Sequence, residues 1–151
     1  MSKLIYRCAE IHMQHIAQGG DPFENGSSRP LDFGHWAAHK LEQMTNYAIR
    51  HGEAVAMGIV LDVTYSKLLG LINQETLNNI RSLFKRTNLD ITLPIKEEKE
   101  VEELLKGIEE FREHLGGKLT ITLIPSIGKK VDVHEIDYDK MREAIALCSS
   151  Y

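Results

Sequence analysis

The chain has 151 residues, of which 42% are hydrophobic and 26% charged, and its formal net charge is −4. This length and apolar content suit one globular domain and exclude global disorder. The negative charge argues against a nucleic-acid partner, which would require a basic face. No apolar run approaches the roughly 20 residues that cross a bilayer, and the first residues lack the apolar core of a signal peptide. We therefore expect a cytoplasmic protein with no nucleic-acid or membrane partner.

Helical periodicity dominates the first half of the sequence. Apolar residues recur at helical spacing over 3–17, and glycines, prolines and polar residues then predict a long loop over 18–31. The pattern turns helical again over 32–44, and a longer helix is predicted over 51–70. Because residues 54–61 are apolar on nearly every face of that helix, we expect it to lie at the centre of the fold.

The second half continues with helices and ends with a change of period. A surface helix is predicted over 75–86 and another over 101–115, where a glycine pair follows. The alternating, β-branched run over 118–124 and a short second run predict a β-hairpin. Asp137 or Asp139 can cap a last helix. The sequence therefore predicts a mainly α fold of five or six helices with one small β-hairpin.

Three of the seven histidines fall close together, at His35, His39 and His51. The first two are four residues apart and share a helix face, and an antiparallel pair of helices would return His51 alongside His35. Neutral imidazoles that converge in this way are suitable ligands for zinc, cobalt, nickel or iron. Glu42 and Glu53 are candidates to hold a metal-binding histidine in place through a hydrogen bond or to act as a general base. The spacing favours a metal site, although packed or solvated histidines without a metal would share the same pattern.

These histidines lie in the segments LDFGH at 31–35, HKLE at 39–42 and HGEAVAMG at 51–58. Together the segments resemble the 3-dehydroquinate synthase family of sugar-phosphate cyclases. The specific part of the resemblance runs from Glu24 to Gly58. It implies that residues 1–151 form a single metal- and substrate-binding helical domain, the C-terminal half of such an enzyme, with the N-terminal NAD-binding domain absent from this chain.

The resemblance also implies roles for individual residues. His35 and His51 match the two family histidines that bind a divalent metal, zinc or cobalt, and the third family ligand is a glutamate that would precede residue 1. His39 matches the histidine that contacts the phosphate and aids its elimination, and Glu24 matches an active-site acid. The implied parent is a homodimeric enzyme that uses NAD, held mainly by its N-terminal domain, and the metal. It releases phosphate from a sugar phosphate and closes a carbocycle, and the chain alone is expected to be inactive.

Several substrate-contacting positions depart from the family pattern. A family lysine is Gln14 here, a family arginine is Ser28 with Arg29 beside it, and the asparagine before the first metal histidine is Asp32. Arg112 stands where the family has a pair of lysines. The two missing cations hold the substrate carboxylate in the family. We therefore expect a sugar phosphate without that carboxylate as the substrate, with Asp32, Arg29 and Arg112 as candidate contacts.

Two other interpretations of the sequence stay open. A non-catalytic helical interaction domain could retain the family fold, and the lost cations favour it. A stand-alone metal-dependent hydrolase would need a further carboxylate ligand, which Asp32 or Glu53 could supply. The retained trio of histidines favours the cyclase, because a scaffold has no chemical need for three imidazoles there.

Overall fold

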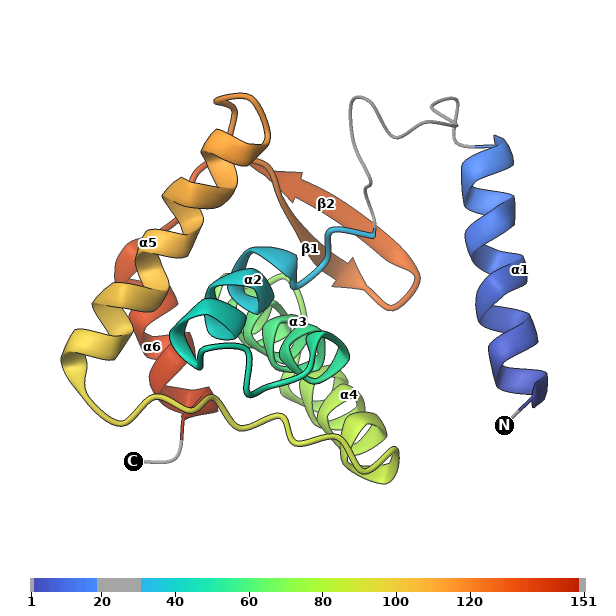
Figure 1. Ribbon diagram of the computed structural model, residues 1–151, viewed down its shortest axis with the longest axis horizontal. Helices are drawn as coiled ribbons and strands as arrows, with labels where there is room; N and C mark the ends of the chain where they lie inside the picture. Colours follow the sequence, from blue (N-terminus) through green and yellow to red (C-terminus); the bar gives the residue numbers. More distant parts are fainter. Residues whose placement is uncertain (1, 19–30, 150–151) are drawn as a thin grey trace. The chain divides into compact units, whose positions relative to one another are not determined.

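The structure is a computed structural model that describes residues 2–18 and 31–149. The chain divides into two units, 1–31 and 32–151, which are described separately. The described part of the first unit contains one helix, α1 (Ser2–Gln18), where the periodicity predicted a helix over 3–17 (Figure 1). The candidate site residues Glu24 and Arg29 lie outside the described residues, as does nearly all of the predicted loop over 18–31.

The second unit is mainly α with one small hairpin, as predicted (Figure 1). Its elements are α2 (His35–Met44), α3 (His51–Leu68), α4 (Gln74–Arg86), α5 (Glu98–His114), β1 (Ile121–Ser126), β2 (Lys129–Val133) and α6 (Tyr138–Cys148). Asp137 caps α6 by accepting a hydrogen bond from the Lys140 N–H, one of the two capping arrangements predicted. No helix in the described part of the chain is long and apolar enough to span a bilayer.

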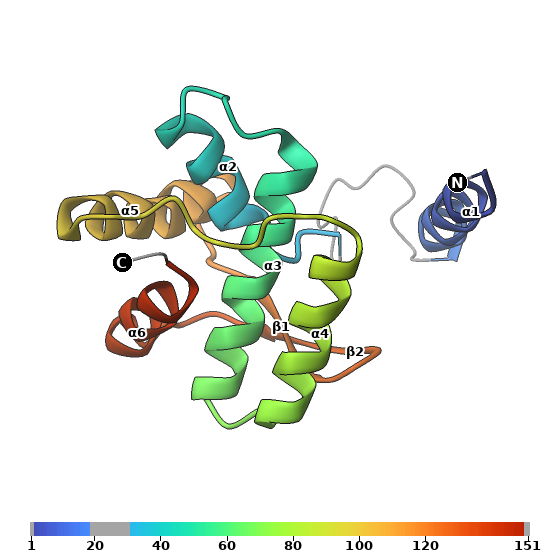
Figure 2. The same cartoon turned by 90° about the horizontal axis from the view of Figure 1, so that it is seen from below.

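The helix α3 is the centre of this unit, as its apolar sequence predicted. Figures 1 and 2 show α3 in the middle, with α2, α4 and α6 around it and the hairpin against it. Large side chains such as Leu61 and Tyr65 are almost completely buried on α3. Burial of this kind is the main source of stability, at about 1.5–3 kcal/mol for each large apolar side chain. The site described below lies at the N-terminal end of α3.

The hairpin packs on α3 through its first strand. β1 and β2 are antiparallel, with Ile121 opposite Val133 and Leu123 opposite Val131, and the register is irregular between Leu123 and Ser126. Ile121 and Leu123 are buried in the main core. The alternation in the sequence reflects this packing, because successive strand residues face opposite sides of the sheet.

The second predicted helix begins later than its sequence pattern suggested. The prediction placed its start at residue 32, whereas α2 begins at His35 and residues 31–34 form a turn. Gly34 has φ of 79°, a left-handed conformation that a helix cannot include and that glycine adopts at little cost. The turn lies directly on α3, where a Cβ built on Gly58 would be 2.0 Å from the Gly34 carbonyl oxygen. The close contact between two glycines thus determines where α2 begins.

Candidate metal centre

The three histidines are brought together by a reversal of the chain between α2 and α3. Asn46 and Tyr47 have positive φ values of 49° and 59°, and this turn leads the chain back so that His51 opens α3 beside α2. The ring centroids of His35 and His51 lie 5.4 Å apart. This convergence of two successive helices is the geometry that the spacing predicted.

His39 completes a compact group of three imidazoles. Its ring centroid lies 5.6 Å from that of His35 and 5.7 Å from that of His51. His35 and His39 share one face of α2, as the four-residue spacing requires. Three imidazoles at nearly equal spacing form a cluster rather than a row along the helix.

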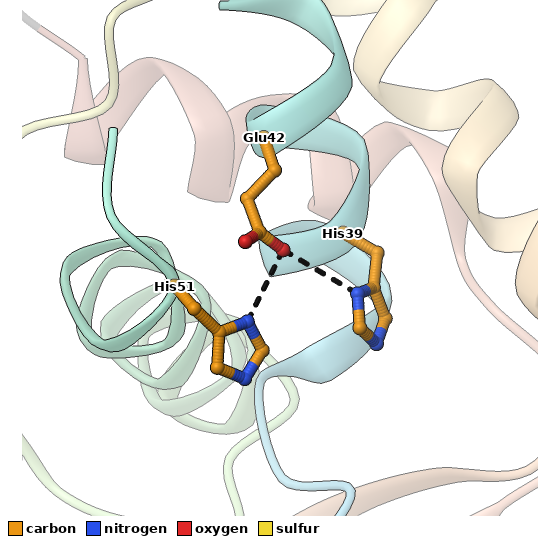
Figure 3. Close-up of side chains that lie close together, drawn as sticks. All are labelled: His39, Glu42 and His51. Atoms are coloured by element: carbon orange, nitrogen blue, oxygen red, sulfur yellow. Dashed lines mark hydrogen bonds and ion pairs between the residues drawn. The ribbon is translucent and has the colours of Figure 1, made fainter. Parts of the chain in front are cut away.

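Glu42 contacts two of these histidines with the same oxygen atom. Its Oε2 lies 3.2 Å from His51 Nδ1 and 3.4 Å from His39 Nδ1 (Figure 3). The Glu42 side chain is 14% exposed, whereas those of His39 and His51 are 52% and 53% exposed. The carboxylate therefore lies behind two imidazoles that are open to solvent. The sequence had named Glu42 as a candidate partner, and the structure places it at the cluster.

Glu53, the other carboxylate named from the sequence, has a local role. Its side chain accepts a hydrogen bond from the Arg50 N–H at 3.1 Å, in a capping box at the start of α3. It is not one of the three residues whose ligand atoms cluster among the described residues, which are His39, Glu42 and His51. Glu53 therefore serves to begin the helix that carries His51.

His35 is suited to act as a neutral ligand. Burial is the largest cause that lowers its pKa below the ordinary value, and the neighbouring rings of His39 and His51 lower it further. Its Nδ1 lies 3.3 Å from the carbonyl oxygen of Phe33. Because a carbonyl can only accept, Nδ1 carries the hydrogen and Nε2 keeps its lone pair. Neutral imidazole nitrogen is what zinc or cobalt requires, so the His35 ring is in a state that suits a divalent metal.

Asp62, on α3, binds the residues directly before and after His35, and the sequence did not reveal this role. Its carboxylate accepts hydrogen bonds from the Gly34 N–H at 3.0 Å and from Trp36 Nε1–H at 2.8 Å. Asp62 is completely buried, and burial raises its pKa to about 7 against the opposing effect of the two donors. The signal that could have revealed it is an acidic residue inside a long apolar helical run.

The remaining predicted contacts lie around the cluster or apart from it. The backbone carbonyl of Asp32 accepts a hydrogen bond from the His35 N–H at 2.9 Å, which ties Asp32 to the first turn of α2. Arg112, on α5, forms an ion pair with Glu109 at 2.6 Å. A cavity of about 330 Å³ lies beside the cluster, and His39 lines it, but Arg112 does not.

Comparisons of this sequence with a family model and with curated proteins point to the same family. The 3-dehydroquinate synthase C-terminal family matches residues 1–112. The chain is 31% identical over 129 residues to the 2-epi-valiolone synthase of Actinosynnema mirum, covering 84% of this chain and 34% of that protein. It is 33% identical over 145 residues to the 3-dehydroquinate synthase of Vibrio atlanticus, covering 95% of this chain and 39% of that protein. The chain thus spans little more than a third of the length of these relatives.

Two solved structures share the fold at low sequence identity. A 2-epi-5-epi-valiolone synthase from Streptomyces hygroscopicus, with NAD⁺ and Zn²⁺ bound, matches with a TM-score of 0.78 at 20% identity, over 90% of this chain and 37% of that one. A 2-deoxy-scyllo-inosose synthase complexed with carbaglucose-6-phosphate, NAD⁺ and Co²⁺ matches with a TM-score of 0.59 at 16% identity, over 82% of this chain and 36% of that one. Both matches concern the arrangement of helices described above.

Proposed function

We propose that this chain, which belongs to the 3-dehydroquinate synthase C-terminal family, is the metal- and substrate-binding domain of an NAD- and metal-dependent sugar-phosphate cyclase. The observation that carries the proposal is the convergence of three imidazoles, His35, His39 and His51, at centroid distances of 5.4 to 5.7 Å. The NAD⁺ and the Zn²⁺ or Co²⁺ named with the two solved structures support the same cofactors here. In this proposal NAD binds mainly to the part of a longer, homodimeric parent enzyme that corresponds to the rest of its relatives, and residues 1–151 alone are inactive.

The proposed metal ligands from this chain are His35 and His51. Burial keeps the His35 ring neutral, and its Nδ1 hydrogen bond to Phe33 directs Nε2 away from the backbone. Asp62 restrains the residues on both sides of His35, so the ring keeps its place when substrate binds. A bound divalent metal supplies Lewis-acid polarisation of a substrate oxygen.

His39 is the proposed residue for phosphate departure. It is half exposed and lines the cavity of about 330 Å³, so a substrate phosphate can reach its ring. The Glu42 carboxylate lies 3.4 Å from Nδ1 of His39 and orients the imidazole. His39 can then donate a hydrogen bond or a proton to a phosphate oxygen as the phosphate leaves. Glu24 is proposed as a further acid, and Asp32, Arg29 and Arg112 as substrate contacts.

The proposed substrate is a sugar phosphate that lacks the carboxylate of the dehydroquinate precursor. Gln14, an uncharged residue in α1, stands where the family has a lysine, and a 31% identical relative is named a 2-epi-valiolone synthase. We expect the full-length parent to release phosphate from the dehydroquinate precursor only slowly, and Gln14→Lys to raise that rate. Phosphate release from both substrates, followed in the same assay, checks this. Efficient release from the carboxylate substrate by the unmodified enzyme would refute the substrate assignment.

Metal retention tests the cyclase assignment directly. In the full-length enzyme, His35→Ala is expected to abolish the metal that survives gel filtration in a chelating buffer, measured by elemental analysis, because one of the two histidine ligands proposed from this chain is removed. His114→Ala, a histidine of α5 outside the cluster, is the matched control and should keep the metal. Full metal content in His35→Ala would contradict the proposed ligand role. A parent that holds no metal and releases phosphate from no sugar phosphate would instead indicate the alternative, a non-catalytic helical interaction domain.

A further inference from the structure

We propose that this chain binds a divalent cation by itself, through Nδ1 of His39, Oε2 of Glu42 and Nδ1 of His51. This donor set, called here the Nδ1 site, differs from the pair His35 and His51 assigned above. It contains its own carboxylate ligand and needs none from outside the described residues. The inference goes beyond the proposed function, because it concerns cation binding without NAD, substrate or further protein.

Two distances within the Nδ1 site match those between neighbouring metal ligands. Glu42 Oε2 lies 3.2 Å from His51 Nδ1 and 3.4 Å from His39 Nδ1 (Figure 3), and each of the three residues offers one ligand atom within 4.8 Å of the other two. In a tetrahedral zinc site with bonds of 2.0–2.1 Å, adjacent donor atoms are about 3.3–3.4 Å apart. Hydrogen bonds between a charged imidazole and a carboxylate are shorter, at about 2.7–2.9 Å. The two contacts to Glu42 are longer than this, so their spacing also suits ligands of a shared cation, while the 3.2 Å contact with His51 is a hydrogen bond in the metal-free chain.

The chemistry of the three donors also fits a transition metal. Two imidazoles and one carboxylate form the facial set that binds Fe²⁺ and related ions with positions left open. Here the open side is the solvent side, because the His39 and His51 side chains are 52% and 53% exposed while Glu42 is 14% exposed. The predicted ligands are thus three protein donors with water in the remaining positions.

The fold holds these donors in place before any cation binds. His39 and Glu42 are three residues apart on one face of α2, so a single helix fixes two of the three. His51 is the first residue of α3, the helix packed most extensively against α2. Binding therefore requires little ordering of the backbone, which favours affinity.

His35 is not part of the Nδ1 site. Its own Nδ1 is engaged by the Phe33 carbonyl at 3.3 Å, and its ring centroid lies 5.4 Å from that of His51. Because His51 belongs to both donor sets, the chain presents it either to a cation beside His35 or to one beside Glu42. Of the two donor sets, only the Nδ1 site has all three of its proposed protein ligands among the described residues.

The experiment is a titration of the metal-free 151-residue chain with Co²⁺, followed by visible absorption, with Zn²⁺ used in competition. We expect one Co²⁺ per chain. Glu42→Gln and His39→Ala should each weaken Co²⁺ binding by at least about tenfold. Substitution of a residue that only holds a metal ligand in place already lowers metal affinity by about 10- to 100-fold, so removal of a direct ligand should cost no less. His35→Ala should keep the affinity within about twofold, and Gln43→Ala, beside Glu42 on α2, is the matched control.

Two outcomes would overturn the Nδ1 site. One is the absence of Co²⁺ binding by the unmodified chain, and the other is a loss of binding in His35→Ala with none in Glu42→Gln. Since His39 is half exposed, its truncation does not threaten the fold, and far-ultraviolet circular dichroism checks each variant. The titration contains no NAD or sugar phosphate, so a failure of the proposed cyclase function would leave its result unchanged.

Discussion

Gly58→Ala is expected to lower the free energy of unfolding by about 3 kcal/mol or more, at the upper end of the cost of overpacking a core. A Cβ at this position would lie 2.0 Å from the Gly34 carbonyl oxygen and 2.9 Å from its carbonyl carbon. These are backbone atoms and cannot rotate away as the end of a side chain could. The turn before α2 would have to move off α3. Urea denaturation followed by circular dichroism measures the loss.

Gly52→Ala is the matched control for this substitution. Gly52 also lies in α3, but a Cβ there would meet nothing within 4 Å. Alanine favours a helix over glycine by up to about 1 kcal/mol, so this variant should be as stable as the unmodified chain or slightly more so. Equal stabilities for the two alanine variants would show that the contact between Gly34 and Gly58 is not part of the folded protein. A full-length enzyme with Gly58→Ala that folds should also retain less of the metal proposed to bind His35, because His35 follows the displaced turn.

The second large effect is a dependence of stability on pH that comes from Asp62. Burial raises the pKa of this carboxyl from 3.8 to about 7 in the folded protein. The folded state therefore binds the proton more tightly than the unfolded state does. The contribution of Asp62 to the free energy of unfolding is fully present below about pH 4 and is lost as the pH rises through about 7. The two pKa values differ by about 3, which corresponds to about 4 kcal/mol.

Asp62→Asn isolates this contribution, because the amide does not titrate. We expect the stability of the unmodified chain, relative to that of Asp62→Asn, to fall by up to about 4 kcal/mol between pH 4 and pH 8. Urea midpoints measured at a series of pH values give the difference. Asp139→Asn is the control, since the Asp139 side chain is completely exposed and should give a nearly constant difference. Parallel pH profiles for the unmodified chain and Asp62→Asn would contradict the assignment.

Most of the fold could be predicted because local patterns and tertiary packing agree in it. The helix predicted over 51–70 is α3 (His51–Leu68), since an apolar surface on every face can only be buried at the centre. The hairpin was predicted from residues 118–124, although β1 begins at Ile121. The start of α2 was wrong by three residues, because the position of Gly34 depends on a partner 24 residues away on α3.

The candidate site was predictable only in part. The spacing of His35 and His39 determined their shared helix face, and the short connection to His51 predicted that an antiparallel helix pair would return His51 beside His35. That the His35 and His51 rings lie 5.4 Å apart confirmed this expectation. Nothing in the sequence indicated that one Glu42 oxygen would lie between two imidazoles, because that contact depends on how far α3 is rotated against α2.

The sequence alone therefore determined the helical class and the candidate histidines, since periodicity and residue spacing act over one or two turns of helix, and the family followed from the resemblance of its motifs. The tertiary structure alone decided which atoms meet. Asp62 reaches Gly34 and Trp36 across 28 and 26 residues, and its burial follows from the packing of α2 on α3. Contacts between distant residues depend on packing that no local pattern encodes, so they appear only when the whole unit is folded.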